Sequence, residues 1–382
     1  IGGIVTISVG HCHPKVIEKT RAQMEKLQHT TTIYLHPNLG ALARKLASKM
    51  PEGLEVTYFV NSGSEANDLA MLMARLYTGN YDMIALKNCY HGAVSSVLGL
   101  TSHYTWKYPV PHGHGIHHVP CPDPYRSPFA GDDEKIAQKS ADEIRSTIQY
   151  GTCGKIAGII VEPIQGVGGT TAGPKSFYQK AYEIACEHGG IYISDEVQTG
   201  FGRTGDHYWG FENYDLKPHM VTMAKGLGNG IPIAAVTTTK EIAATMAQKI
   251  HFNTFGGNPV STAQALAVLE VIDEENLQEN AKVVGTYFKE GMKKLQEKYS
   301  LIGDVRGKGL MLGMEFVKNR ESKEPATEET ALFVEECKKL GVLLGKGGLF
   351  GNVLRIKPPM CITKEDANFA LAVFEKVLEK MG

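Results

Sequence analysis

Short apolar runs and amphipathic segments alternate along most of this chain. Runs without a helical period occur at 56–60, 83–86, 156–161, 191–194, 220–224 and 234–238. Such runs, bounded by glycine and polar residues, are typical of buried strands. Between them, Glu65 to Tyr77 carries apolar residues at helical spacing, and a second apolar helix is expected from Pro259 to Ile272. This alternation predicts an α/β fold whose mostly parallel central sheet is covered by helices.

The pattern changes toward the two ends of the chain. From about Gly303 it predicts strands, turns and a terminal helix from Lys364 to Lys380, which we interpret as a smaller α+β domain. Residues 1–10, IGGIVTISVG, have the composition of a strand. The stretch from His103 to Asp133 is rich in Pro, Gly and His and is expected to be an irregular surface loop.

The length suggests more than one domain, because 382 residues exceed what one small core accommodates. We expect an N-terminal segment (1–37) that joins the small domain, followed by a large cofactor-binding domain (38–275). The C-terminal small domain is expected at 276–382.

Composition excludes several classes of function. Hydrophobic residues make up 42% of the chain and charged residues 21%, as in ordinary globular proteins. With a formal net charge of −1, no basic field is expected to attract nucleic acid or a membrane surface. Seven cysteines without a CxxC pair suit a reducing compartment. The chain begins at Ile1 and not at methionine, so a targeting segment could precede it.

Two of the predicted strands end at residues that suit one cofactor. Asp195 closes the run IYISD, and Lys225 follows the run MVTMA. The carboxyl ends of neighbouring strands form the crevice where open α/β sheets bind ligands. Pyridoxal phosphate requires a lysine amine for a Schiff base and a carboxylate that keeps its pyridine nitrogen protonated. The pair indicates such a site, although a single Asp or Lys is more often a solvated loop charge.

The segment NSGSEAN, between a predicted strand and helix, suits a phosphate. Ser62 and Glu65 form the S-x-x-E pattern of a capping box. Gly63 allows backbone N–H groups to approach an anion that the helix dipole favours. The alternative is a capped structural helix that binds nothing. A second segment, HFNTFGGNP, places the Thr254 hydroxyl before another helix and favours the phosphate interpretation.

Four further residues are candidates for contacts with a flat cofactor or its substrate. Tyr90 could stack on a ring, while Val197 and Gln198 could supply an apolar contact on the other face and a donor to a phenolic oxygen. Arg355, in LRIKPPM, could clamp a substrate carboxylate. Taken singly, each is more often a core, loop or surface residue.

Two other kinds of site are less well supported by the sequence. A metal could bind four histidines that lie within seven residues, His112, His114, His117 and His118. No carboxylate stands near them at helical spacing, so we expect no metal site. GKGLMLG, from Gly307, lacks the G-x-G-x-x-G register, and a strand is expected to follow it, so a nicotinamide site is disfavoured.

SGSEAN, YHG, EPIQG, DEVQTGFGRTG, MAKGLGNG and FNTFGGNP occur in the order and at the spacing seen in the class III pyridoxal-phosphate-dependent aminotransferases. The resemblance covers essentially the whole chain and is strongest to the type 2 alanine–glyoxylate branch, whose members are mitochondrial. It implies the type I aminotransferase fold, pyridoxal 5′-phosphate as cofactor and amino and 2-oxo acids as substrates. It also implies a homodimer, or a dimer of dimers, with active sites at the subunit interface.

The same resemblance implies a role for each candidate. Lys225 matches the Schiff-base lysine and Asp195 the partner of the pyridine nitrogen. Tyr90 matches the stacking aromatic, with Val197 on the opposite face, and Gln198 matches the contact to the phenolic oxygen.

The resemblance also implies roles for the other six candidates. Gly63 and Ser64 match the phosphate-binding amides, and Thr254 matches the phosphate contact donated by the partner subunit. His91 belongs to the YHG motif of the cofactor site. Glu162 matches a supporting acid beneath the cofactor. Arg355 matches the arginine that holds the substrate α-carboxylate.

One departure from related branches bears on the substrate. Ornithine- and 4-aminobutyrate-type members carry a glutamate after EPIQG that can mask the carboxylate arginine, whereas this chain has Val167. An unmasked Arg355 favours a ping-pong transamination between amino acids such as alanine and oxo acids such as glyoxylate.

Two rival interpretations remain. NVLRIKPPMCITKEDA is similar to the ethanolamine-phosphate phospho-lyases of the same fold, but those carry proline after the lysine, where this chain has Gly226. The second rival, a non-catalytic protein that keeps the fold, is disfavoured because Lys225, Asp195 and Arg355 are all present.

Overall fold

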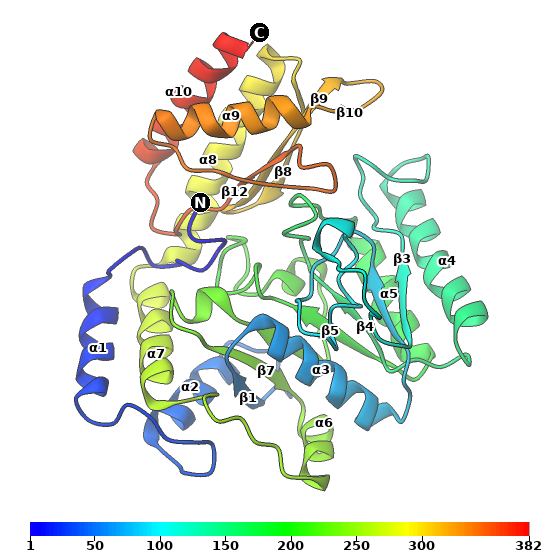
Figure 1. Ribbon diagram of the computed structural model, residues 1–382, viewed down its shortest axis with the longest axis vertical. Coiled ribbons are helices and arrows are strands. Elements are labelled where there is room, and N and C mark those ends of the chain that lie inside the picture. Colours follow the sequence, from blue (N-terminus) through cyan, green and yellow to red (C-terminus); the bar gives the residue numbers. More distant parts are fainter. Residues whose placement is uncertain (382) are drawn as a thin grey trace.

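The computed structural model describes residues 1–381 and contains two sheets in separate layers (Figure 1). The larger sheet has seven strands in the order β1-β7-β6-β5-β4-β2-β3. Their bounds are β1 Val56–Val60, β2 Met83–Leu86, β3 Ile116–Val119, β4 Gly158–Val161, β5 Ile191–Asp195, β6 Met220–Met223 and β7 Ala234–Thr238.

The larger sheet is mostly parallel, as predicted. Strands β3, β2, β4, β5 and β6 pair in parallel, and only β7 runs against its neighbours β6 and β1. In the register of β5 and β6, Asp195 lies opposite Thr222, so the chain after Asp195 and the chain after Met223 leave the same edge of the sheet. This arrangement brings the segment that follows Asp195 close to Lys225.

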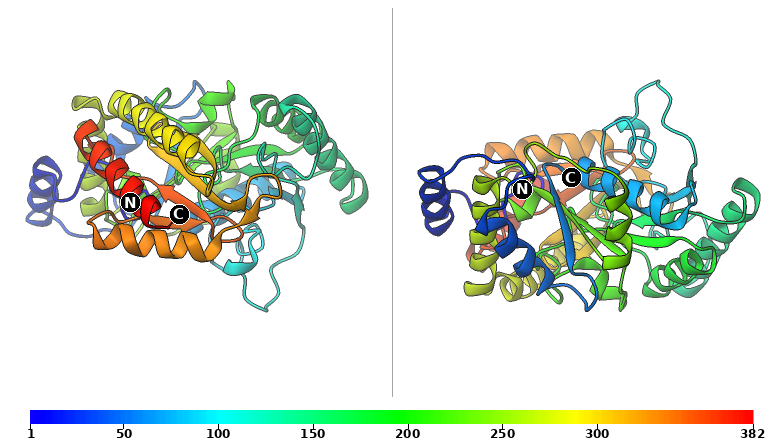
Figure 2. Two further views of the ribbon diagram at one scale, coloured as in Figure 1. Left: turned by 90° about the horizontal axis from the view of Figure 1, so that it is seen from above. Right: turned by 90° about the horizontal axis from the view of Figure 1, so that it is seen from below.

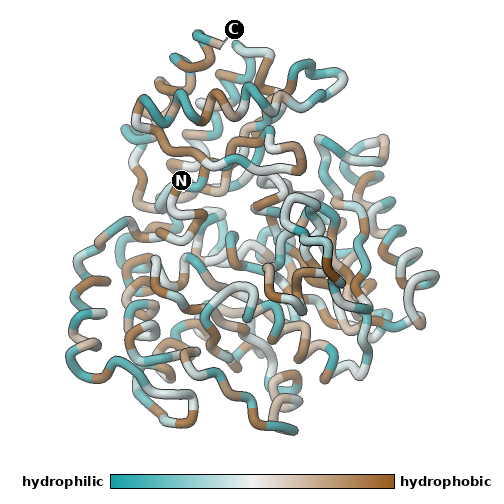
Figure 3. The backbone as a smooth tube through the Cα atoms, in the orientation of Figure 1, coloured by the Kyte–Doolittle hydropathy of each residue, from teal (hydrophilic) through white to brown (hydrophobic). Residues whose placement is uncertain are grey.

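Both faces of this sheet are buried because successive apolar residues in each strand point to opposite sides. On one face, Ile160 and Ile193 pack with helix α3 (Gly63–Thr78). On the other, Ile159 and Tyr192 pack with the helices α4 (Asp133–Gly151) and α5 (Lys175–Glu187). Continuous apolar runs are typical of strands covered on both faces. Figure 2 shows helices around the sheet, and in Figure 3 hydrophobic colours gather along the central strands.

The second sheet has five strands, all paired in antiparallel fashion, and lies above the first in Figure 1. Its strands are β8 Ile302–Lys308, β9 Met311–Asn319, β10 Glu324–Pro325, β11 Gly345–Gly347 and β12 Val353–Ile356. It packs with three helices through a core that includes Phe288, Phe316, Phe333 and Phe374. The predicted α+β character of this part is confirmed.

The three helices predicted from periodicity are present as α3, α7 (Pro259–Glu274) and α10 (Lys364–Met381). The other helices were not predicted: α1 Pro14–Met24, α2 Pro37–Ala47, α4, α5, α6 Lys240–Ala244, α8 Leu277–Lys298 and α9 Thr327–Lys339. None of the helices within residues 1–381 is long and apolar enough to cross a membrane.

Two predictions about local structure are wrong. Residues 1–10 form turns and no strand, because Gly3, Ile4 and Val5 adopt positive φ angles that break an extended chain. Their backbone instead bonds to the segment after β12, where the Gly2 N–H donates to the carbonyl of Lys357 at 2.8 Å. The expected loop from His103 to Asp133 contains the edge strand β3, whose apolar content is low because it pairs with β2 alone.

The division at 37 and 276 stays a prediction. Asn276, between α7 and α8, has φ 52°, a left-handed conformation that turns the chain out of α7. The segments on either side of it pack into different cores, α7 with the larger sheet and α8 with the smaller.

Trp209 anchors the long connection between β5 and β6, the segment that begins at Asp195. It is fully buried, and its ring lies 5.1 Å from that of Phe201 and 5.1 Å from that of Tyr208. Its indole N–H donates to the carbonyl of Lys49 at 2.7 Å. The ring therefore fixes this connection against α2 and the loop that follows it.

Replacing Trp209 with alanine is expected to lower the free energy of unfolding by about 3–5 kcal/mol, because the change leaves a large cavity. The measurement is chemical denaturation followed by circular dichroism. Trp106, the other tryptophan, is 46% exposed, and its replacement with alanine serves as the control. Equal losses in the two variants would contradict the anchoring role.

Candidate active site

Loops at the carboxyl ends of β1, β2, β4, β5 and β6 surround a cavity of about 160 Å³. Its position is the crevice expected for a ligand in an open α/β sheet. Nine of the eleven predicted site residues line it. The complete lining is Gly63, Ser64, Asn67, Tyr90, His91, Gly92, Glu162, Asp195, Val197, Gln198 and Lys225.

Asp195 ends β5 as a buried carboxylate held by three donors. Asn67 Nδ2 and His91 Nδ1 both lie 2.8 Å from its Oδ2, and the backbone N–H of Val197 donates to Oδ1 at 3.1 Å. Asp195 itself is 3% exposed. Donors of this kind hold a carboxylate in one orientation inside a protein.

His91 supports this carboxylate through its Nδ1 atom, while its Nε2 atom is buried with no partner in the described residues. Burial by itself lowers the pKa of the His91 imidazole, but the contact with Cys89 and the hydrogen bond to Asp195 outweigh burial and raise it. The thiol of Cys89 donates to the carbonyl of Leu100. We therefore attribute the raised pKa mainly to the carboxylate of Asp195.

Lys225 follows β6 and projects into the cavity. Its backbone has φ 41°, a strained conformation for a residue with a side chain, as is common at functional sites. Burial lowers the pKa of its amine, with Arg355 acting in the same direction and Asp195 and Glu162 opposing it. The amine is thus easier to deprotonate than an ordinary lysine, and only the neutral amine can attack a carbonyl.

The start of α3 offers unpaired donors to the cavity. No residue in the described chain accepts from the backbone N–H groups of Gly63 and Ser64, the first two of the helix. The predicted capping box is only half formed. Ser62 Oγ accepts from the N–H of Glu65 at 3.2 Å, but the Glu65 carboxylate bonds to Asn61 and not to the Ser62 N–H.

Glu162, after β4, joins two of the loops around the cavity. Its carboxylate accepts from the N–H of Tyr90 and from the N–H of Gly166, each at 2.9 Å. Burial raises the pKa of this carboxyl, and the nearby His91 opposes the change. Glu162 was predicted to support the cofactor. Its contacts show that it holds the backbone N–H groups of Tyr90 and Gly166 in place.

Several glycines keep the cavity open. A Cβ atom on Gly63 would lie 3.1 Å from a methyl carbon of Val197, and one on Gly92 would lie 2.5 Å from Ser64 Oγ. On Gly166 it would lie 2.4 Å from the amide of Gln198. Side chains at these positions would displace residues that line the cavity.

Tyr90 places an aromatic ring at the edge of the cavity. Its ring centroid lies 5.2 Å from that of Trp106 in an edge-on arrangement. Burial raises the pKa of its hydroxyl, which remains protonated at neutral pH. The ring is available to cover one face of a planar ligand.

Two predicted residues do not line the cavity. Arg355, on β12, is 8% exposed, and its Nε and Nη1 atoms are buried with no acceptor in the described residues. Its influence on the pKa of Lys225 places its charge near the site. Thr254 is exposed on a loop away from the cavity lining, and the contact predicted for it in a second subunit stays a prediction.

Sequence reasoning missed Asn67 and Gly92, although both belong to motifs that it used. In SGSEAN, Asn67 lies one turn into α3, on the face that carries Gly63 and Ser64, and so reaches Asp195. Gly92 closes YHG with φ 129°, a conformation that only glycine adopts readily.

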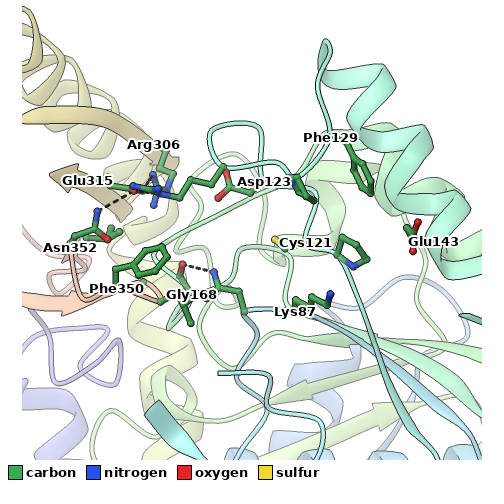
Figure 4. Close-up of a pocket in the computed structure, with 17 residues that line it drawn as sticks. Lys87, Cys121, Asp123, Phe129, Glu143, Gly168, Arg306, Glu315, Phe350 and Asn352 are labelled. Carbon is green, nitrogen blue, oxygen red and sulfur yellow. Dashed lines mark hydrogen bonds and ion pairs between the residues drawn. The ribbon is translucent and has the colours of Figure 1, made fainter. Parts of the chain in front are cut away.

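A larger cavity of about 610 Å³ lies beside this site, between the two sheets (Figure 4). The buried carboxylate of Glu315 in its wall is paired with Arg126 at 2.5 Å and with Arg306 at 2.7 Å. Asn352 also donates to Glu315, at 3.2 Å. None of the predicted site residues lines this cavity.

The histidine cluster is divided between other partners. His117 Nε2 lies 2.8 Å from Asp82, and His118 Nε2 lies 3.1 Å from the carbonyl of Leu100. Burial lowers the pKa of His118 to about 4. No group of three or more potential metal ligands is assembled within residues 1–381.

The donor set of the smaller cavity fits pyridoxal phosphate. Free N–H groups at the start of α3 suit a phosphate, the fixed carboxylate of Asp195 suits a protonated ring nitrogen, and the amine of Lys225 suits an aldehyde carbon.

Comparisons with curated proteins agree with this geometry. The chain is 50% identical over 379 residues to alanine–glyoxylate aminotransferase 2 homolog 2, mitochondrial, of Arabidopsis thaliana, covering 99% of this chain and 78% of the relative. It is 47% identical over 396 residues to alanine–glyoxylate aminotransferase 2, mitochondrial, of Homo sapiens, covering 98% and 77%.

Solved structures show the same fold. An amine transaminase from an uncultivated Pseudomonas species, in its PLP-bound form, matches with a TM-score of 0.93 and 29% identity, covering 100% of this chain and 90% of the other. An Arthrobacter phospholyase in complex with phosphoethanolamine matches with a TM-score of 0.92 and 33% identity, covering 99% and 88%. The model of the aminotransferase class-III family matches residues 1–378. This chain therefore belongs to the class-III aminotransferases.

Proposed function

We propose that this aminotransferase binds pyridoxal phosphate and moves the amino group of alanine, or a related amino acid, to glyoxylate by a ping-pong mechanism. The observation that carries the proposal is the meeting of Lys225 and Asp195 at one cavity whose free N–H groups suit a phosphate. The choice of alanine and glyoxylate is supported by the two relatives of 47–50% identity, which are named for them.

Each group of the cofactor has a matching residue. Gly63 and Ser64 would bind the phosphate, Asp195 the ring nitrogen, Tyr90 and Val197 the two faces of the ring, and Gln198 the phenolic oxygen. When bound, pyridoxal phosphate draws electrons from the substrate Cα and carries the amino group between half-reactions.

Lys225 is the residue that moves the proton. Because burial lowers the pKa of its amine, the neutral form that can take the proton from the substrate Cα is easier to reach than in an ordinary lysine. Asp195, fixed by Asn67 and His91, would hold its carboxylate in one orientation toward the ring nitrogen.

Arg355 is the residue that orients the substrate. Two of its buried nitrogen atoms lack acceptors, and a substrate carboxylate would pair with the guanidinium charge. Val167, in the position of the masking glutamate of other branches, leaves the guanidinium free. Small amino and oxo acids with one α-carboxylate fit this arrangement.

We propose further that two copies assemble as a homodimer. Leu35 is 93% exposed and Ile250 96%, and Phe255 is 63% exposed. The ring centroids of His29 and Phe255 lie 5.6 Å apart, so the segment that leads to Leu35 lies beside the segment that carries Ile250 and Phe255. Apolar surface of this extent suits a subunit interface, and it would carry Thr254 toward a second active site. A mitochondrial location is supported by the names of both relatives.

Lys225→Ala is expected to abolish the covalent attachment of the cofactor. The change also removes the base, which alone slows the reaction roughly 10²- to 10⁴-fold. Absorbance spectroscopy after borohydride treatment and dialysis reports the attachment. Lys240→Ala, at a side chain 70% exposed, is the control. Retained covalent label in the Lys225 variant would refute the assignment.

Arg355→Ala is expected to lower kcat/KM for alanine roughly ten- to hundredfold, because a charge-assisted hydrogen bond to the substrate carboxylate is lost. The assay follows pyruvate release in the first half-reaction and glycine formation after glyoxylate is added. Arg21→Ala, at an exposed site on α1, should leave the rates unchanged. Release of phosphate from phosphoethanolamine, with no transfer from alanine, would instead support the phospho-lyase alternative.

Thr254→Ala is expected to raise the dissociation constant of the cofactor roughly tenfold or more, because a phosphate contact is lost. Sedimentation of the unaltered protein should give twice the mass of one chain. Ser146→Ala, at an exposed site on α4, should retain the cofactor as tightly as the unaltered protein. A monomer with full cofactor affinity would contradict the shared site.

A further inference from the structure

Lys357 is a buried lysine beside the site to which the proposed reaction gives no role. It follows β12 directly and is 1% exposed. Its Nζ donates to the carbonyl of Gly166 at 3.2 Å and to Oε1 of Gln198 at 3.1 Å. It forms no ion pair with any acid in residues 1–381. Burial of an unpaired ammonium group is costly, so this position calls for an explanation.

The surroundings favour the neutral amine. Burial lowers the pKa of Lys357 well below its ordinary value, and the positive charges of Arg355, Lys225 and Arg203 act in the same direction, while Glu162 opposes them. A neutral amine has two N–H groups, and the structure offers two acceptors. The third proton of an ammonium would find none.

These two hydrogen bonds determine which way the amide of Gln198 points. Its oxygen must face Lys357 for both N–H groups of the amine to be satisfied, and its Nε2 then faces the cavity that Gln198 lines. A Cβ atom on Gly166 would lie 2.4 Å from Cδ, Nε2 and Oε1 alike, so the amide lies flat over this glycine. No residue in the described chain accepts from Nε2.

We propose that Lys357 is a positioning residue that holds the amide of Gln198 so that its N–H is presented to the phenolic oxygen of the cofactor. The inference rests on the proposed function, because it needs a ligand with such an oxygen in the cavity. Lys357 follows β12 of the smaller sheet, and Gln198 lies in the connection after β5 of the larger sheet. The orientation of the Gln198 amide therefore also depends on where β12 lies.

The test is a double-mutant cycle read by spectroscopy. Lys357→Met, Gln198→Ala and the double variant are purified with cofactor, and the pH midpoint of the change in the cofactor absorption band is measured for each. A donor to the phenolic oxygen stabilises its anionic form, so each single change should raise the midpoint by about one pH unit. The double variant should match Gln198→Ala alone, since the lysine acts through the glutamine.

Two further variants complete the design. Lys346→Met, at an exposed lysine on the adjacent β11, should keep the original midpoint. Lys357→Gln, whose neutral amide retains N–H donors, should shift the midpoint by less than Gln198→Ala does, and it serves as the test if the methionine variant does not fold. An unchanged midpoint in Lys357→Met, a shift in Lys357→Gln as large as that in Gln198→Ala, or additive shifts in the double variant would overturn the inference. Absence of a cofactor band in the unaltered protein would overturn the proposed function instead.

Discussion

The active site is organised by two buried carboxylates, and each must be given hydrogen-bond donors. A carboxylate removed from water without donors would cost several kilocalories per mole, so its surroundings have to supply them. Asp195 takes its donors from Asn67 and His91, and Glu162 takes them from the N–H groups of Tyr90 and Gly166. Those donors belong to the segments that enclose the cavity. Satisfying the two acids therefore also shapes the site.

The smaller sheet is tied to this arrangement by a buried arginine. Arg203 lies in the connection after β5, and its Nη1 donates to the carbonyl of Leu310 at 3.1 Å and to that of Pro358 at 2.8 Å. Pro358 follows Lys357, and Arg355 is three residues before it. The guanidinium thus holds in place the segment that would bind the substrate, while the larger sheet holds the residues for the cofactor. Arg203 thus joins the two parts together with the hydrogen bonds from Lys357 to Gly166 and Gln198.

The sequence predicted those features that depend on local pattern. The strands of the larger sheet appear as continuous apolar runs because both of their faces are buried, and the motif residues adjoin those runs. Strand β3 was missed because an edge strand that carries His117 and His118 lacks such a run. The N-terminal residues were misassigned because composition does not reveal positive φ angles.

Lys357 shows most clearly what the sequence could not reveal. A lysine two residues after Arg355 is, from sequence alone, expected to be a surface charge. Its burial follows from the turn after β12, which inserts it between Gly166 and Gln198, residues 191 and 159 positions away in the chain. Gly166 leaves the space, Glu162 fixes Gly166, and Gln198 supplies the acceptor. Because each of these contacts depends on the others, the role of the lysine becomes visible only in three dimensions.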